Sequence, residues 1–65
     1  MNIVLNGEPR QVNAAALNEV LAEVGFAGAV VATALNGSFI AAPARAETVL
    51  SEGDRLEVLA PMQGG

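Results

Sequence analysis

Residues 13–26, with the sequence NAAALNEVLAEVGF, decide the fold. Apolar side chains recur in this stretch at positions i, i+3, i+4 and i+7, which places them on one face of an α-helix. These side chains are Leu17, Val20, Leu21 and Val24. Asn13 is a favourable N-cap residue, and Gly25 can take the left-handed conformation that ends a helix. Phe26 can then fold back onto the last turn. The stretch predicts one amphipathic helix whose apolar face must be covered.

The chain before this helix predicts a β-hairpin. Residues 1–5 alternate between the two faces of a strand, with Val4 directed outward. Asn-Gly at residues 6–7 is a preferred dipeptide for a tight turn. Pro9 suits an edge position because it cannot donate a hydrogen bond to a neighbouring strand. Residues 10–12 are the predicted return strand.

The chain after the helix predicts three further strands. Residues 30–35 form a near-continuous apolar run, as expected for a central strand. A second Asn-Gly turn at residues 36–37 leads into a short return strand over residues 38–40. Residues 44–50 are less regular and predict a short 3₁₀ or helical turn. Residues 55–60 alternate cleanly and predict the last strand.

The order of these elements predicts the fold class. A single helix must bury its apolar face, and only a sheet is available to cover it. The result is an α+β fold of the β-grasp (ubiquitin-like) type, a mixed sheet of four to five strands packed on one α-helix. The first and last strands are expected to lie side by side and parallel in the middle of the sheet. We expect residues 1–60 to form this domain and residues 61–65 to form a flexible C-terminal Gly-Gly tail.

Composition excludes most kinds of chemistry for the chain itself. Its 65 residues suffice for one domain and include no cysteine and no histidine, which removes disulfides, thiolate metal sites and the commonest general base. A net charge of −4 with three scattered arginines argues against nucleic-acid binding. The spacing of Glu52, Asp54 and Glu57 fits no calcium-loop pattern, so we expect no metal site. With no targeting or membrane-spanning segment recognised, we expect a soluble, cytoplasmic protein that is not an enzyme.

The last residues are the remaining unusual feature. Residues 60–65 read APMQGG, and the α-carboxylate of Gly65 is itself a candidate substrate. A carboxylate must be activated before it reacts, and Gly64 and Gly65 have no Cβ to obstruct a narrow nucleotide site. Fully extended, residues 61–65 reach on the order of 17 Å. We therefore expect the tail to enter a partner's active site while the domain docks outside it.

The whole chain resembles the ThiS family, the small sulfur carriers of thiamine biosynthesis. The resemblance lies in VVATALNG at residues 30–37, GDRLEVL at residues 53–59 and MQGG at residues 62–65. It implies that Gln63, Gly64 and Gly65 are threaded into partner active sites, and that the carboxylate of Gly65 becomes an acyl adenylate and then a thiocarboxylate.

The resemblance also implies the partners. A ThiF-type adenylyltransferase would use ATP and Mg²⁺ to adenylate the tail, while the chain itself binds no cofactor. A cysteine desulfurase or another sulfur donor would then displace AMP. The thiocarboxylate would supply sulfur to a ThiG-type thiazole synthase. We expect the free carrier to be a monomer.

The sheet face opposite the helix is the expected docking surface. If alternate residues of the last strand point to the core, Leu59 points outward, as does Val4 on the first strand. Val4, Leu59 and Met62 are the candidate docking residues. Three alternatives remain open: the small subunit of molybdopterin synthase, a ubiquitin-like protein modifier without lysine, and an interaction module whose tail has no role.

Overall fold

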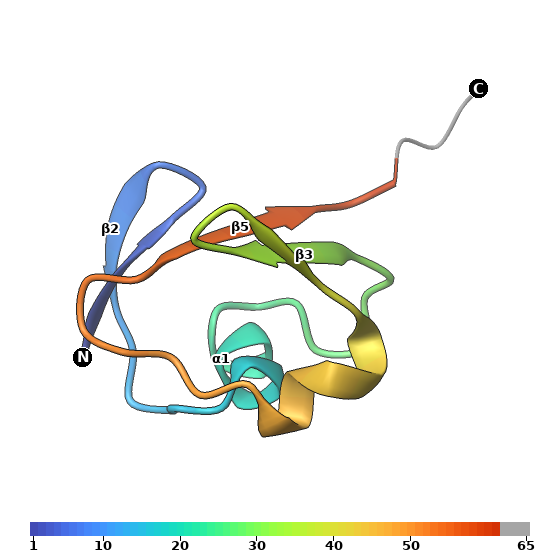
Figure 1. Ribbon diagram of the computed structural model, residues 1–65, viewed down its shortest axis with the longest axis horizontal. Coiled ribbons are helices and arrows are strands. Elements are labelled where there is room, and N and C mark those ends of the chain that lie inside the picture. Colours follow the sequence, from blue (N-terminus) through green and yellow to red (C-terminus); the bar gives the residue numbers. More distant parts are fainter. Residues whose placement is uncertain (62–65) are drawn as a thin grey trace.

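The computed structural model describes residues 1–61, in which a five-stranded mixed sheet is covered on one face by one α-helix (Figure 1). The strands are β1 (Asn2–Leu5), β2 (Glu8–Gln11), β3 (Ala32–Leu35), β4 (Ser38–Ile40) and β5 (Arg55–Leu59), in the sheet order β2-β1-β5-β3-β4. The helix is α1 (Leu17–Glu23), and a 3₁₀ helix, η1 (Ala42–Glu47), precedes the last strand. This arrangement confirms the predicted β-grasp architecture.

Both Asn-Gly dipeptides form the predicted tight turns. Asn6 and Asn36 have φ of 49° and 50°, and the glycines that follow them have φ of 83° and 85°. Positive φ at both central residues is the requirement of a type I′ turn, whose twist matches that of the flanking strands. Pro9 lies in the edge strand β2, opposite Val4, as its missing N–H requires. The return strand itself begins at Glu8, two residues earlier than predicted.

Strand β5 lies in the middle of the sheet, as predicted. It pairs parallel with β1, where Leu5 is opposite Leu56, and antiparallel with β3, where Ala32 is opposite Leu59. The parallel pairing is short because β1 turns away after Leu5. Beyond that point only β3 pairs with β5 as a strand.

Two asparagine side chains continue the hydrogen bonding of β5 where the neighbouring strands end. The side-chain oxygen of Asn6 accepts from the N–H of Val58 at 2.8 Å, and its amide group donates to the carbonyl of Val58 at 3.2 Å. At the other end of β5, the side-chain oxygen of Asn36 accepts from the N–H of Arg55 at 2.9 Å. The two turns therefore hold β5 from opposite sides as well as closing the hairpins.

The core lies between the sheet and α1. Its buried members come from the inner faces of β1 and β5, the helix and the connecting segments: Ile3, Leu5, Val12, Leu17, Val20, Leu21, Leu50, Leu56 and Val58. The buried helical residues belong to the stripe predicted from the sequence. Thr33, the one buried polar residue among those described, donates its hydroxyl hydrogen bond to the carbonyl of Ile40 at 2.7 Å.

The start of the helix differs from the prediction. Asn13 is not the N-cap, because α1 begins at Leu17 after Ala16, whose side chain offers no capping oxygen. The preceding residues run beside the segment before β5 instead: Ala16 bridges Val49, and Leu17 N–H donates to the carbonyl of Thr48 at 2.8 Å. This tertiary pairing overrides the high helix propensity of the alanines before Leu17.

The side chain of Glu23 forms hydrogen bonds to the backbone at and after Asn13, the predicted N-cap. Its carboxylate accepts hydrogen bonds from the N–H groups of Asn13 and Ala14 at 2.8–3.0 Å. The hydrogen bond from Ala14 and then that from Asn13 lower the pKa of this carboxyl group below its ordinary value. The last turn of α1 is thereby tied to the segment that enters it.

The end of the helix confirms the prediction. Gly25 has a φ of 102°, and its N–H donates to the carbonyl of Ala22 at 3.3 Å. Phe26 N–H donates to the carbonyl of Leu21 at 2.8 Å, which completes a Schellman motif. The half-buried Phe26 packs against the core from this position.

The bounds of two further elements differ from the prediction. Strand β3 begins at Ala32 rather than at residue 30, and Val30 is 80% exposed in the loop before it. The 3₁₀ helix spans Ala42–Glu47, so it begins and ends earlier than the predicted span of residues 44–50. Pro43 lies in its first turn, where a missing N–H costs nothing.

We predict that Asn6→Gly lowers the free energy of unfolding by about 1–3 kcal/mol, because both backbone groups of Val58 lose their partner. Glycine keeps the positive φ of the turn, so the loss reports the side chain alone. Asn6→Asp retains an acceptor for the Val58 N–H and should lose less. Urea unfolding measures both variants, and an unchanged stability of Asn6→Gly contradicts the assigned role.

We predict that Glu23→Gln removes a pH-dependent part of the stability. The lowered pKa of Glu23 in the folded chain stabilises the fold above the pKa of this group in the unfolded chain, and this stabilisation is lost as the pH falls through the folded pKa. The difference in Tm between wild type and Glu23→Gln should therefore shrink from about pH 7 to about pH 2. Glu19→Gln, on the same helix, controls for the loss of one charge. A difference in Tm that is constant with pH contradicts the assignment.

Candidate functional site

The last strand leads out of the domain beside an uncovered face of the sheet. Strand β5 ends at Leu59, and Ala60 and Pro61 follow it as exposed residues without regular structure. The last residue of β5 is opposite Ala32, the first residue of β3. Pro61 lies at the predicted boundary between domain and tail.

The predicted site residues of the tail lie beyond this point. Met62, Gln63, Gly64 and Gly65 are outside the residues that the structure describes, so their assigned roles stay predictions. What the structure gives is the place from which these residues depart and the surface next to it.

The uncovered face carries a continuous apolar strip across three strands. Leu59 on β5 is opposite Ala32 on β3, and Ala34, two residues further along β3, is opposite Phe39 on β4. Side chains at directly opposite positions lie about 5 Å apart, and residues i and i+2 of a strand share a face. We name the four residues Leu59, Ala32, Ala34 and Phe39 the apolar strip. Leu59 is 70% exposed and Phe39 71% exposed, so both ends of the strip are open to a partner.

Val4 lies on the same face but apart from the strip. It is half-buried on β1 and is paired with Arg55, four residues before Leu59. Four residues of a strand span about 13 Å. The structure thus places the predicted docking residues Val4 and Leu59 on one face without joining them, since the outward-facing positions of Arg55 and Glu57 lie between.

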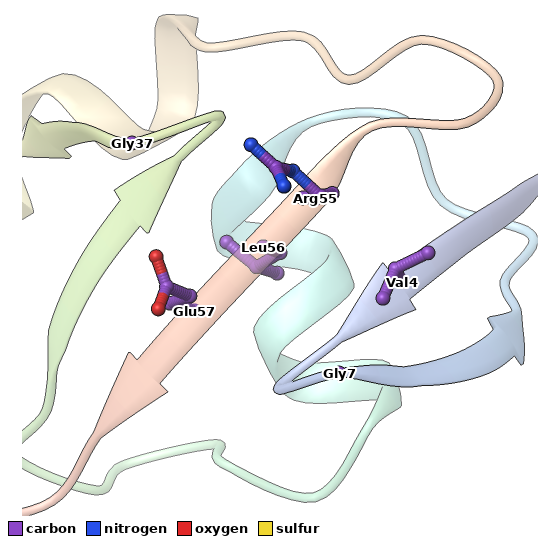
Figure 2. A pocket seen from close by; sticks show the side chains of 6 residues that line it. All are labelled: Val4, Gly7, Gly37, Arg55, Leu56 and Glu57. Carbon is purple, nitrogen blue, oxygen red and sulfur yellow. The ribbon is translucent and has the colours of Figure 1, made fainter.

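A hollow of about 230 Å³ occupies this intervening region. Figure 2 shows β5 running through it, with Arg55 and Glu57 on the strand and Val4 on the β1 side. The two glycines of the Asn-Gly turns, Gly7 and Gly37, lie at its borders, where no Cβ fills the space. The outer face therefore combines a shallow charged hollow with an apolar strip that ends at the exit of β5.

Phe39 is the residue that the sequence interpretation missed. A large aromatic residue in an apolar chain suggests a core position. The sequence feature that could have indicated its exposure is the two-residue turn. This turn fixes Leu35 opposite Ser38 and hence Ala34 opposite Phe39. Once Val58 is placed in the core, its neighbour Thr33 faces inward, and the adjacent positions on β3 and β4 must face outward.

The two acidic residues just before β5 bond neighbouring groups of the fold. Asp54 accepts hydrogen bonds from the N–H of Ser51 and the side-chain amide of Asn36, and Glu52 accepts from the N–H of Asn2. Within residues 1–61, no three histidine, cysteine or acidic side chains lie close enough together to hold a metal ion. No helix in the same residues is long and apolar enough to cross a membrane.

Comparisons with known proteins agree on one family. The model of the ThiS family matches residues 3–65. A sulfur carrier protein ThiS from Thermus thermophilus is 43% identical over 61 residues, which cover 94% of this chain and 95% of that protein.

Solved structures give the same result. The crystal structure of a thiamine biosynthesis protein (ThiS) from Geobacter metallireducens matches with a TM-score of 0.83 and 35% identity over the full length of both chains. A solution structure of a thiamine biosynthesis protein from the same organism matches with a TM-score of 0.79 and 33% identity, covering all of this chain and 88% of the other.

We predict that truncation of Leu59 changes the stability of the fold far less than truncation of Leu56, three residues away on β5. Leu59→Ala should change the free energy of unfolding by less than about 0.5 kcal/mol, because the side chain is exposed. Leu56→Ala should cost about 2–5 kcal/mol, because this side chain is fully buried. Denaturant unfolding of both variants measures the difference. A large loss in Leu59→Ala would show that this side chain stabilises the fold and is not kept free for a partner.

Proposed function

We propose a specific carrier chemistry for this chain, which belongs to the ThiS family, the sulfur carriers of thiamine biosynthesis. In this proposal the carboxyl group of Gly65 holds the sulfur atom, and residues 61–65 are the arm that carries it. The observation that supports it best is the family match, which extends through residue 65 and so includes the Gly-Gly pair. A further support is that β5 ends at Leu59, which is paired with Ala32, so the arm starts two residues after a residue held in the sheet.

The proposed chemistry begins with activation of the carboxylate. A carboxylate oxygen of Gly65 attacks the α-phosphorus of ATP on a ThiF-type adenylyltransferase, and pyrophosphate leaves. The outer sulfur of a donor persulfide, such as that of a cysteine desulfurase, then attacks the acyl carbon and AMP leaves. A thiol cleaves the S–S bond of the resulting acyl disulfide, which releases the thiocarboxylate and leaves the donor cysteine in a disulfide with that thiol. This group presents a soft, ionised sulfur near neutral pH, in a role analogous to that of a thiolate. A ThiG-type thiazole synthase receives the sulfur.

The division of roles follows from the composition. The chain has no cysteine and no histidine, so the partners supply the nucleophilic sulfur and the acid–base groups. ATP and Mg²⁺ belong to the adenylyltransferase, and this chain holds no cofactor of its own. Because the reaction consumes ATP, we place the carrier in the cytoplasm.

The apolar strip is the proposed docking surface. Exposed apolar side chains that form a patch mark interaction sites more often than isolated ones do. Phe39 and Leu59 are the two large side chains of the strip, and Leu59 is also the last residue before the arm leaves the sheet. Val4 and Met62, which the sequence suggested, extend the surface in this proposal toward the hollow and along the arm.

We predict that the chain gains the mass of one oxygen-to-sulfur replacement when it is incubated with an adenylyltransferase of this type, ATP and a sulfide source. Intact-mass spectrometry measures the change. Deletion of Gly65 should abolish it with little change in Tm, because the residue lies beyond the last strand. A chain that stays unmodified under conditions in which another ThiS-family carrier reacts argues against the proposed function.

A second variant separates docking from chemistry in the same assay. Leu59→Ser should raise the concentration of carrier needed for half-maximal rate and leave the rate at saturation close to that of wild type. Asn18→Ser, an exposed substitution on the helix at the other face, is the matched control. Equal effects of the two substitutions contradict docking through the apolar strip.

A further inference from the structure

We propose that Arg45 is a positioning residue that fixes the base from which the C-terminal arm departs. The proposal rests on the proposed function, because it assigns Arg45 a part in presenting Gly65 to a partner. Arg45 acts on the arm through β3: it holds the start of that strand, which is the neighbour of the last residue of β5.

The end of β5 depends on the start of β3. On one side of β5, strand pairing with β1 stops at Leu56, and the Asn6 side chain reaches no further than Val58. On the other side, pairing with β3 extends to the pair of Ala32 and Leu59. The direction in which Ala60 leaves the sheet is therefore set by the position of Ala32.

Arg45 holds the backbone and side chain on either side of Ala32. Its Nη2 donates to the carbonyl of Val31 at 2.6 Å, and its Nε donates to the hydroxyl of Thr33 at 3.1 Å. The hydroxyl of Thr33 donates in turn to the carbonyl of Ile40, so the same group connects β3 with β4. Both acceptors of Arg45 are neutral oxygens, so no carboxylate competes in these contacts for the orientation of its guanidinium group.

Arg45 is itself attached to the helical layer. It lies in η1, and its carbonyl accepts from the N–H of Thr48 at 3.2 Å. The carbonyl of Thr48 accepts from the N–H of Leu17 at the start of α1. A chain of contacts therefore runs from the helix through Arg45 to the start of β3, and from Ala32 to the end of β5.

The chemistry of this contact is specific to arginine. The planar guanidinium group donates in two directions at a fixed spacing, and its always-charged state makes hydrogen bonds to carbonyls stronger than neutral ones. A lysine ammonium carries the same charge, but it is a single point on a flexible stem and cannot reproduce the two fixed contacts. A role in positioning thus predicts that lysine does not replace arginine.

The expected consequence is a loss in the rate of the chemical step. A reacting group that is displaced by about 1 Å can lose about 100-fold in rate, even when the altered residue lies far from the chemistry. We expect Arg45→Met and Arg45→Lys each to lower the saturated rate of Gly65 adenylation by about 10- to 100-fold. Half-saturation should change by less than about threefold, since the exposed apolar side chains of Leu59 and Phe39 are both still present for docking.

The test compares these variants with a chain that is destabilised elsewhere. Val12→Ala removes part of the buried Val12 side chain. The backbone N–H of Val12 donates to the carbonyl of Met1, so the change lies at the N-terminal hairpin. Figure 1 places this N-terminal end of the chain on the opposite side of the domain from the end of β5. For each variant, Tm, adenylation kinetics and amide hydrogen exchange at Ala32 and Leu59 are measured.

A selective loss of rate in both Arg45 variants, with faster exchange at Leu59 than in Val12→Ala at matched stability, supports the proposal. A wild-type rate in Arg45→Lys, or the same loss of rate in Val12→Ala, overturns it. If the wild-type chain is not adenylated at all, the proposed function fails. In that case hydrogen exchange is the remaining test of the positioning role of Arg45. Equal protection at Leu59 in Arg45→Met and Val12→Ala overturns that role.

Discussion

The structure depends on hydrogen bonding to both sides of β5. This strand brings Leu56 and Val58 into the core and, within residues 1–61, is the only one that joins the two hairpins. The neighbouring strands are too short to bond all backbone groups of β5. Strand β1 pairs with it over only two residues before turning away. The side chains of Asn6 and Asn36 take over at the two ends, where they bond the backbone of Val58 and Arg55. A 65-residue chain without a disulfide thereby keeps a central strand with few unpaired groups.

The same arrangement exposes the surface that we propose for docking. One helix covers one face of the sheet, and every residue of β5 that alternates with the core points to the other face. Because the neighbouring residues on β3 are alanines with small side chains, Leu59 and Phe39 stay exposed. The apolar strip ends at Leu59, where the chain leaves the sheet. The exposed apolar strip that we propose for docking is therefore a consequence of the register rather than an addition to the fold.

The sequence predicted those features whose cause is local. The apolar stripe of α1, its end at Gly25 and both Asn-Gly turns follow from spacing and from residues that tolerate positive φ. The features it missed depend on contacts between distant segments. Asn13 lost its predicted role because residues 15–17 pair with residues 48–50, and Glu23 bonds the backbone there instead. The exposure of Phe39 follows from the register of three strands, and Arg45 gains its partners only when η1 packs beside β3.

A carrier that owns no catalytic group can influence its reaction only through the placement of its end. Two requirements then conflict. Glycine has no side chain to obstruct a narrow partner site, but ordering a segment that contains glycine costs more conformational entropy. In our proposal the described part of the chain reduces this cost by holding the base of the arm, through the Ala32–Leu59 pair and the two contacts of Arg45. Because a fixed base shortens the segment that each partner must order, our proposal links the stability of the start of β3 to the efficiency of sulfur transfer.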